Sequence, residues 1–445
     1  MTATAADDRA LQEAAPWWRP AAGQRLLIRG GARLQGRYPI SGAKNAALPL
    51  MVAVLLTPHL VTLRNLPASL DVAVLAGLLQ RLGVGLSWSA GARGLVLTAC
   101  ADRLRPEAIE AGLVARMRAS VLLLGALLGR CGQARLPLPG GDAIGLRGID
   151  FHLDGLRAMG ATITLDQGVI EARAPQGLTG ADIRLPFPSV GATENLMLAA
   201  VLARSTTTLR NAAREPEIAD LARCLIGMGA AIEGLETDTL VIAGGRALVG
   251  AQHAVMPDRI ELGTLACAAA ATDGELLLEG GDLAALAAAG PALQAAGVEM
   301  EAGAEGVVAR RAAGGLQGID VRTAPFPGFA TDLQSPVMAL LTRARGASAV
   351  TEAIFEQRFR HVDELRRMGA RIALRGQTAW IRGVPKLTGA RLLATDVRAG
   401  AALVLAALAA EGDSLLEGLD HLDRGYDGMV AKLSGCGAAL RRGDF

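Results

Sequence analysis

The chain has 445 residues, enough for two or three domains with substantial cores. Its 45 basic and 43 acidic side chains leave a net charge of +2 without a block of like charge, which excludes a nucleic-acid footprint and favours a small-molecule or protein partner. The longest apolar runs, 120–129 and 401–410, reach about half of the roughly 20 residues that a membrane span needs, so no membrane partner is expected.

We interpret residues 1–21 as a disordered tail. This segment carries Asp7, Asp8 and Glu13 and lacks the apolar core of an export signal. The five cysteines are an odd number without metal-binding spacing, which predicts neither disulfides nor a metal site. We therefore expect a cytoplasmic protein in a reducing compartment.

From residue 22 onward, one unit repeats six times at a period of roughly 71 residues. Each copy contains an amphipathic helix that ends in small residues and is followed by a strand. Glycine ends a helix in the left-handed conformation without a steric penalty, so it is expected at this point. The six terminating glycines are Gly83, Gly160, Gly229, Gly297, Gly369 and Gly437.

A second helix precedes the amphipathic one in each copy and is apolar nearly all round, so we expect it to be buried on every side. These helices are predicted at 43–56, 116–128, 191–203, 261–271, 332–341 and 397–410. A strand and a polar loop separate the two helices, and two or three alternating strands follow the second. Each copy is therefore a buried helix, a strand, an outer helix and a small sheet.

The copies divide into two domains. The last copy, 396–445, is short, and residues 22–43 resemble the segment before the sixth buried helix, so we expect them to complete that copy. Residues 44–256 would then form one domain and residues 22–43 plus 257–445 the other. The cleft between two such domains is the default ligand site.

Polar residues interrupt the apolar pattern at the starts of the buried helices and in the loops that follow the strands. Free N–H groups at helix starts and bidentate arginines suit phosphates and carboxylates, so these positions predict a multiply charged anionic substrate. Taken singly, each residue could instead be solvated or a helix cap, as we interpret His152 and His361. The strongest candidates, which lack counterparts in most sister copies, are Lys44, Asp142, Arg147, Asp332 and Arg424.

Ten phrases occur in the order ISGAKNAALP, MRAS, LPGGDAIG, SVGATEN, NAAREPEI, PDRIELGT, FPGFATDLQ, FEQRF, TDVRAGAALVLA and HLDRGY. Together, from about Leu26 to Gly443, the chain resembles the UDP-N-acetylglucosamine enolpyruvyl transferase (1-carboxyvinyltransferase) family. The resemblance implies an α/β fold, a two-domain inside-out α/β barrel of six copies, which agrees with the repeat. It also implies transfer of enolpyruvyl from phosphoenolpyruvate to the 3-hydroxyl of UDP-N-acetylglucosamine, through a tetrahedral ketal and without metal or organic cofactor, in peptidoglycan synthesis.

The resemblance implies roles for individual residues. Asp142 would protonate C3 of phosphoenolpyruvate and Asp332 would take the proton from the acceptor hydroxyl, while Lys44, Arg147 and Arg424 would hold the anions of phosphoenolpyruvate. The remaining substrate contacts would come from Asn45, Arg118, Gly148, Ile149, Asp150, Phe151, Ser189, Val190, Gly191, Ile354, Arg358, Asp396 and Arg398.

The chain departs from the family pattern at three positions. Asp142 stands where most members have cysteine, which implies insensitivity to the thiol-alkylating antibiotic fosfomycin. Gly148 stands where proline is usual, and Ala115 where lysine is frequent. Two alternatives remain open: a transferase acting on another nucleotide acceptor, and a non-catalytic homologue that binds UDP-N-acetylglucosamine. The sequence also leaves the oligomeric state open.

Overall fold

The computed structural model describes residues 5–19, 23–107, 109 and 111–445, which form two compact units. The first contains Gly42–Asp142 and Arg147–Met256 together with the N-terminal segment. The second contains Pro257–Phe445, the segment that ends at Ser41, and the four residues Ala143–Leu146. The sequence analysis expected domain boundaries at 44 and 257 and placed residues 143–146 in the first domain. The units instead divide at Gly42 and Pro257, and residues 143–146 group with the second unit.

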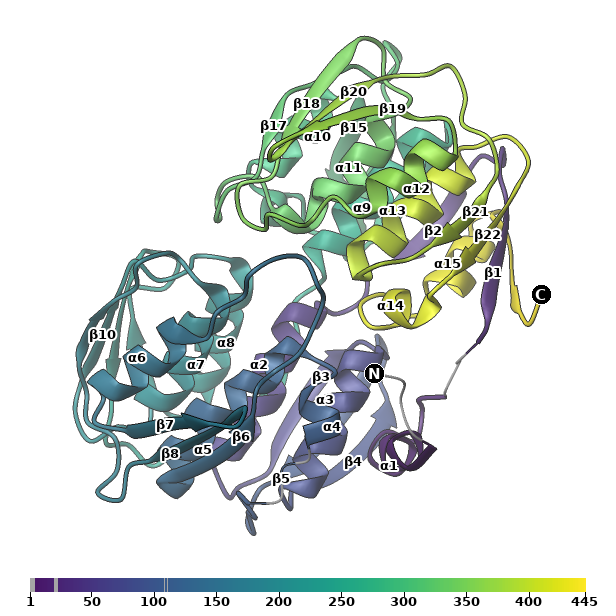
Figure 1. The fold of residues 1–445 in the computed structure, drawn as a ribbon. Coiled ribbons are helices and arrows are strands. Elements are labelled where there is room, and N and C mark those ends of the chain that lie inside the picture. The colour runs from purple at the N-terminus through teal and green to yellow at the C-terminus, as the bar shows by residue number, and fades with distance from the viewer. Residues whose placement is uncertain (1–4, 20–22, 108, 110) are drawn as a thin grey trace. The chain divides into compact units, whose positions relative to one another are not determined.

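Three buried helices form the centre of the first unit, and three outer helices pack around them (Figure 1). The buried helices are α2 (Lys44–Ala53), α5 (Leu122–Cys131) and α7 (Val190–Ala200), and the outer ones are α3 (Leu70–Arg81), α6 (Asp150–Ala158) and α8 (Pro216–Gly227). Short helices at Ala5–Ala14 (α1), Val54–Leu56 (η1), Ala111–Val114 (α4) and Arg118–Val121 (η2) complete the set.

Three small sheets flank these helices. Their strand orders are β13 (Gln252–Ala254), β3 (Val61–Leu66), β5 (Leu95–Cys100) and β4 (Gly85–Ala90); β6 (Gln133–Pro137), β8 (Val169–Arg173) and β7 (Thr162–Asp166); and β11 (Ala231–Glu233), β12 (Thr239–Ala243), β10 (Thr207–Arg210) and β9 (Asp182–Arg184).

The second unit repeats this plan. Its buried helices are α9 (Arg259–Ala271), α11 (Gln334–Leu341) and α13 (Val397–Leu408), and its outer helices are α10 (Ala289–Ala295), α12 (His361–Arg367) and α15 (Met429–Gly435). Every residue of α9 and of α13 is buried, polar ones included, as expected for helices enclosed on all sides. Shorter helices lie at Leu283–Leu286 (η3), Thr331–Leu333 (η4) and Leu419–Asp423 (α14).

The sheets of the second unit have the orders β15 (Val298–Gly303), β16 (Gly306–Arg311), β14 (Glu275–Glu279) and β2 (Gln35–Pro39); β17 (Val321–Arg322), β18 (Ala347–Thr351), β20 (Thr378–Arg382) and β19 (Arg371–Arg375); and β21 (Arg391–Leu393), β22 (Asp413–Glu417), β1 (Arg25–Arg29) and β23 (Ala439–Gly443). The described residues thus form six sheets, one for each predicted copy.

The six predicted helix-terminating glycines all have a positive φ, between +88° and +100°. Each lies just after an outer helix, where the chain reverses into a strand. A side chain is disfavoured in this conformation, which explains the recurrence of glycine. The sixfold unit is therefore confirmed in its helices and its turns.

The expectation that residues 22–43 complete the last copy is only half right. Strand β1 lies between β22 and β23, with Leu27 opposite Leu415 and Arg441, beside the C-terminal strands in Figure 1. Strand β2 instead pairs in parallel with β14 of the fourth copy. Conversely, β13 precedes α9 but pairs with β3 of the first copy. Both strands lie where the chain passes from one unit to the other. We call this the exchange of β2 and β13: β2 completes the sheet of the fourth copy, and β13 completes the sheet of the first copy.

The interpretation of residues 1–21 as a disordered tail is wrong for the part that the structure describes. Helix α1 (Ala5–Ala14) buries Leu11 and Ala14 in the core of the first unit, and the next residue, Ala15, is buried there too. Trp17 then makes an edge-to-face contact with Trp88, with ring centroids 5.6 Å apart. The apolar side chains Leu11, Ala14, Ala15 and Trp18 follow helical spacing, a signal that the acidic residues between them obscure. Residues 1–4 and 20–21 lie outside the described residues.

Candidate active site

Lys44 is the first residue of α2, and its ammonium lies 3.1 Å from Oδ2 of Asp71 at the start of α3. Only 12% of the Lys44 side chain and 4% of the Asp71 side chain is exposed, so the ion pair fixes the lysine beside the helix start. Asn45 follows and is half-buried. A lysine next to the free N–H groups of a helix start suits an anion.

Arg118, the first residue of η2, bridges to the loop that precedes α6. Its guanidinium donates to the backbone carbonyls of Arg147 and Gly148, the latter at 2.6 Å. Burial, aided by the neighbouring Arg147 charge, lowers the pKa of Arg118 to about 10. The structure thus brings Arg118, Arg147 and Gly148 together, and the nearby Asp150 carboxylate acts in the opposite direction on the pKa of Arg118.

Two glycines set the path of the loop that carries Asp142. A Cβ at Gly140 would overlap the carbonyl oxygen of Ala115. Gly141 has a φ of +116°, and a Cβ there would come within 3.0 Å of the Arg118 Cβ. Only glycine permits this close approach, so the pair places Asp142, which is half-buried, directly after the Arg118 contact.

The tip of the same loop groups with the second unit. Leu146 donates its backbone N–H to Oε1 of Glu356 at 2.6 Å, and the N–H of Gln357 donates to the Ile144 carbonyl at 3.0 Å. Ile144 is buried. Asp142 and Arg147 are therefore the residues at which the chain leaves and re-enters the first unit.

His152, on α6, belongs to a buried chain of hydrogen bonds. The N–H of Gly125 donates to Oδ1 of Asn195 at 2.9 Å, so the Asn195 amide nitrogen, 3.1 Å from His152 Nδ1, donates to the ring. This assigns the neutral tautomer with the proton on Nε2. Burial lowers the pKa of His152 to about 3, so the ring stays neutral at physiological pH. Its Nε2 edge faces Gly191 at the start of α7.

The remaining predicted contacts of the first unit lie at the starts of α6 and α7. Ser189 caps α7 by accepting the N–H of Ala192 at 3.3 Å, and Val190 and Gly191 form the first turn. Ile149 precedes α6 and Phe151 lies in its first turn, both half-buried. Each therefore has a local structural role at a helix start, in addition to any substrate contact.

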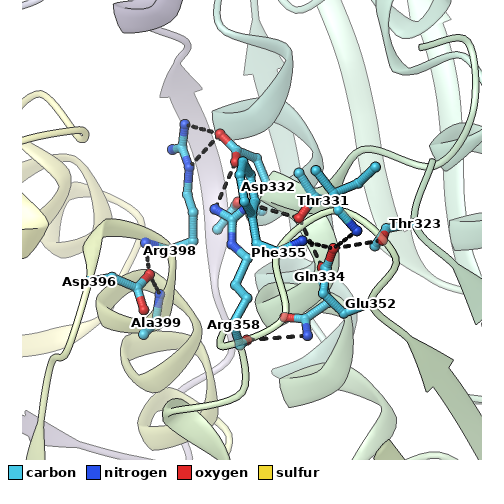
Figure 2. A network of polar contacts seen from close by, with 12 residues as sticks. Thr323, Thr331, Asp332, Gln334, Glu352, Phe355, Arg358, Asp396, Arg398 and Ala399 are labelled. Atoms are coloured by element: carbon cyan, nitrogen blue, oxygen red, sulfur yellow. Dashed lines mark hydrogen bonds and ion pairs between the residues drawn. The ribbon is translucent and has the colours of Figure 1, made fainter. Parts of the chain in front are cut away.

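In the second unit, Asp332 is held between two arginines (Figure 2). Its Oδ1 accepts from Arg358 at 2.7 Å, and its Oδ2 accepts from Arg398 twice, at 2.9 and 3.0 Å. The arginine side chains are 5% and 3% exposed, whereas Asp332 is 24% exposed. The carboxylate is therefore the accessible member of the group, and two guanidiniums stabilise its negative charge.

Further contacts fix both arginines. Arg358 also donates to Thr331 Oγ1 at 2.8 Å and stacks over Phe355. Arg398 lies over the ring of Tyr426, with its guanidinium carbon 5.4 Å from the ring centre. Asp396 does not join the Asp332 group; it caps α13 by accepting the N–H groups of Arg398 and Ala399 at 3.0 and 2.9 Å. Its role is thus to orient the helix that presents Arg398.

The loop with Ile354 is organised by a buried glutamate that the sequence analysis did not single out. Glu352 accepts from the N–H groups of Ile354 and Phe355 at 2.8 and 3.1 Å, and from the hydroxyls of Thr323 and Thr331 (Figure 2). These contacts tie the loop to the helix start that carries Asp332. Nothing local marks Glu352 in the sequence, because its partners come from three separate segments.

Arg424 follows α14 and is half-buried. The next residue, Gly425, packs against Val397, where a Cβ would clash, and lies near the Arg398 guanidinium. The predicted residues therefore fall into two groups, one on each unit. The second-unit group contains Asp332, Arg358, Arg398 and the adjoining Arg424 loop.

Among the described residues, no group of three or more histidine, cysteine, aspartate or glutamate side chains is arranged to hold a metal ion. In the same part of the chain, no helix has the length and apolarity that crossing a membrane requires. The donors at the site are arginines, lysine and backbone N–H groups, which suit anions.

Comparisons with known proteins show which family this chain is similar to. The family model of EPSP synthase (3-phosphoshikimate 1-carboxyvinyltransferase) matches residues 28–433. The UDP-N-acetylglucosamine 1-carboxyvinyltransferase of Granulibacter bethesdensis is 52% identical over 418 residues, 94% of this chain and 99% of that protein. The protein of the same name from Gluconacetobacter diazotrophicus is 53% identical over the same shares.

Solved structures show the same fold. The enolpyruvyl transferase NikO from Streptomyces tendae has a TM-score of 0.85 at 30% identity, covering 94% of this chain and 98% of that one. EPSP synthase from Acinetobacter baumannii has a TM-score of 0.70 at 17% identity, covering 94% and 99%. The expected fold class is confirmed.

Proposed function

The chain belongs to the enolpyruvyl transferase family of EPSP synthase and UDP-N-acetylglucosamine 1-carboxyvinyltransferase, and we propose that it transfers enolpyruvyl from phosphoenolpyruvate to the 3-hydroxyl of UDP-N-acetylglucosamine. The reaction releases phosphate and commits the sugar nucleotide to peptidoglycan. The observation that carries the proposal is an accessible carboxylate, Asp332, held by two buried arginines. It supplies a proton acceptor next to cations for an anionic substrate.

The first half of the reaction is an addition. The acceptor hydroxyl gives its proton to Asp332 while its oxygen bonds to C2 of phosphoenolpyruvate, and the Asp142 carboxyl gives a proton to C3. The product is a tetrahedral ketal with a methyl group. Asp142 must carry a proton to act, and the nearby substrate anions favour that form.

The second half is an elimination. The bond from C2 to the phosphate oxygen breaks, a proton leaves C3 to Asp142, and the double bond re-forms as an enolpyruvyl ether. Lys44, Arg147 and Arg424 offset the charge of the carboxylate and the departing phosphate, because an anion leaves water only where cations replace its hydration. Each step conserves protons without an external oxidant or reductant.

Sugar-nucleotide binding is assigned to the first unit. Asn45, Arg118, the segment Arg147–Phe151 and the α7 start at Ser189–Gly191 would contact it, and Ile354, Arg358, Asp396 and Arg398 would contribute from the second unit. The identity of about half of all residues with carboxyvinyltransferases that use this acceptor supports the assignment. We place the reaction in the cytoplasm, and the five free cysteines fit a reducing compartment.

Phosphate release from phosphoenolpyruvate tests the proposal when measured separately with UDP-N-acetylglucosamine, UMP and shikimate 3-phosphate. We expect kcat/KM with UDP-N-acetylglucosamine to exceed the other values by roughly 10⁴-fold or more, the scale set by lost polar contacts. Faster release with another acceptor would indicate the alternative transferase. Tight binding of UDP-N-acetylglucosamine without any release would indicate a non-catalytic homologue.

A further inference from the structure

Helix α1 lies outside the part of the chain that the family model matches, which begins at residue 28. The carboxyvinyltransferase of Granulibacter bethesdensis is covered over 99% of its length by 94% of this chain, so little of it remains to supply an equivalent segment. We propose that α1 is a positioning element of the active site, which holds residues 111–118 and, through them, Arg118 and the Asp142 loop.

The first step of the argument is how firmly α1 is seated. Leu11 is fully buried, and its Cδ2 lies so near Gly77 of α3 that a Cβ there would be 3.1 Å away. The Cδ1 of Leu113 in α4 would lie 3.5 Å from the same Cβ on Gly77. Leu11 and Leu113 thus pack against the same glycine of α3 and lie in the same core cluster, which places α1 beside the segment ahead of Arg118.

A polar contact reinforces this junction. The Arg116 guanidinium lies 3.8 Å from Oδ1 of Asp8, and the two side chains are only 22% and 26% exposed. At the other end of α1, the Trp88 indole N–H donates to the carbonyl of Ala14 at 2.8 Å. The helix is therefore fixed at both ends, by the segment that leads to Arg118 and by β4.

The opposite side of the same segment contacts the active-site loop. The carbonyl of Val114 accepts the N–H of Gly140 at 3.4 Å, and the Ala115 carbonyl lies against Gly140 without room for a Cβ. Arg118 then donates to the carbonyls of Arg147 and Gly148. Residues 113–118 therefore have α1 on one side and both ends of the Asp142 loop on the other.

The consequence for catalysis rests on the proposed function, because it assigns Asp142 as the acid and Arg118 as a substrate contact. A segment of four helical residues has too few internal hydrogen bonds to hold its own shape, so its neighbours determine its position. Loosening α1 would let residues 113–118 shift, and a shift of about 1 Å at a reacting group can reduce turnover strongly.

Two full-length variants and a matched control test this. Leu11→Ala removes the apolar contact and Asp8→Asn weakens the Arg116 pair. Glu13→Gln changes an exposed residue of the same helix, which pairs with exposed Arg9. Hydrogen–deuterium exchange of residues 136–149 is compared with that of 222–236, and kcat and KM are measured well below the unfolding temperature.

We expect both test variants to exchange residues 136–149 about threefold faster or more, with 222–236 unchanged, and to lower kcat roughly tenfold for Leu11→Ala, while Glu13→Gln matches wild type. A lower melting temperature with unchanged exchange in 136–149 and unchanged kcat would overturn the proposal and leave α1 as a stabilising cover. If wild type itself lacked activity, the proposed function would fail, while the exchange measurement would still decide whether α1 holds the loop.

Discussion

Asp332→Asn separates the chemical role of this carboxylate from its structural one. The substitution keeps the shape but removes the negative charge that accepts three hydrogen bonds from Arg358 and Arg398. Breaking a buried ion pair costs about 3–5 kcal/mol of unfolding free energy. Because Asp332 is 24% exposed and an amide oxygen still accepts one hydrogen bond, we expect Asp332→Asn to lower the unfolding free energy by about 2–3 kcal/mol. Losing the proton acceptor should also lower turnover by roughly 10²-fold or more.

The assay combines phosphate release with urea unfolding of the same samples. Asp413→Asn is the matched control, because Asp413 pairs with Arg29 where both side chains are exposed at strand ends, and it should change neither quantity. Added sulfate should restore part of the stability of Asp332→Asn, since an anion can replace the missing charge between the arginines. Unchanged turnover in Asp332→Asn would remove it from the mechanism, and an unchanged unfolding free energy would refute the structural role.

Two further expectations concern Asp142 and the buried histidines. Asp142→Asn should lose most turnover because an amide cannot donate the C3 proton. Asp142→Cys should stay active and become time-dependently inactivated by fosfomycin, which wild type resists. Rapid covalent inactivation of wild type by fosfomycin, seen by mass spectrometry, would contradict this expectation. His152 and His361 have pKa values lowered to about 3 and about 4, chiefly by burial, so the unfolded chain binds protons near pH 6.5 that the folded chain does not. The unfolding free energy should therefore fall as pH drops from 6.5 toward 4, by about 1.4 kcal/mol per pH unit for each histidine, and His361→Gln should reduce that slope in urea titrations.

The repeat was predictable because its signals are local. The glycine after each outer helix is required by a positive φ at that one residue. A buried helix is recognised by its own apolar composition. The exchange of β2 and β13 is different. Both strands look like the other short strands, and only pairing with β14 and β3, over 180 residues away in the chain, tells them apart.

The candidate site was predictable in its residue types but not in its partners. Lys44, Asp332 and the arginines stand out because they interrupt apolar helix starts. Their supporting acids, Asp71 and Glu352, do not, because an acidic residue at a helix start or after a strand is common and only tertiary contacts give it a role. Asp396 was expected to contact substrate, yet its described contacts are those of a helix cap.

The identity of the reaction product tests the central claim most directly. Purified protein is incubated with phosphoenolpyruvate and UDP-N-acetylglucosamine, and the product is examined by proton NMR and mass spectrometry alongside phosphate release. We predict one enolpyruvyl ether at the 3-oxygen of the sugar for each phosphate released, with two vinyl protons on the new group. Phosphate release without an ether, or an ether on a different oxygen, would contradict the assignment of acceptor and mechanism.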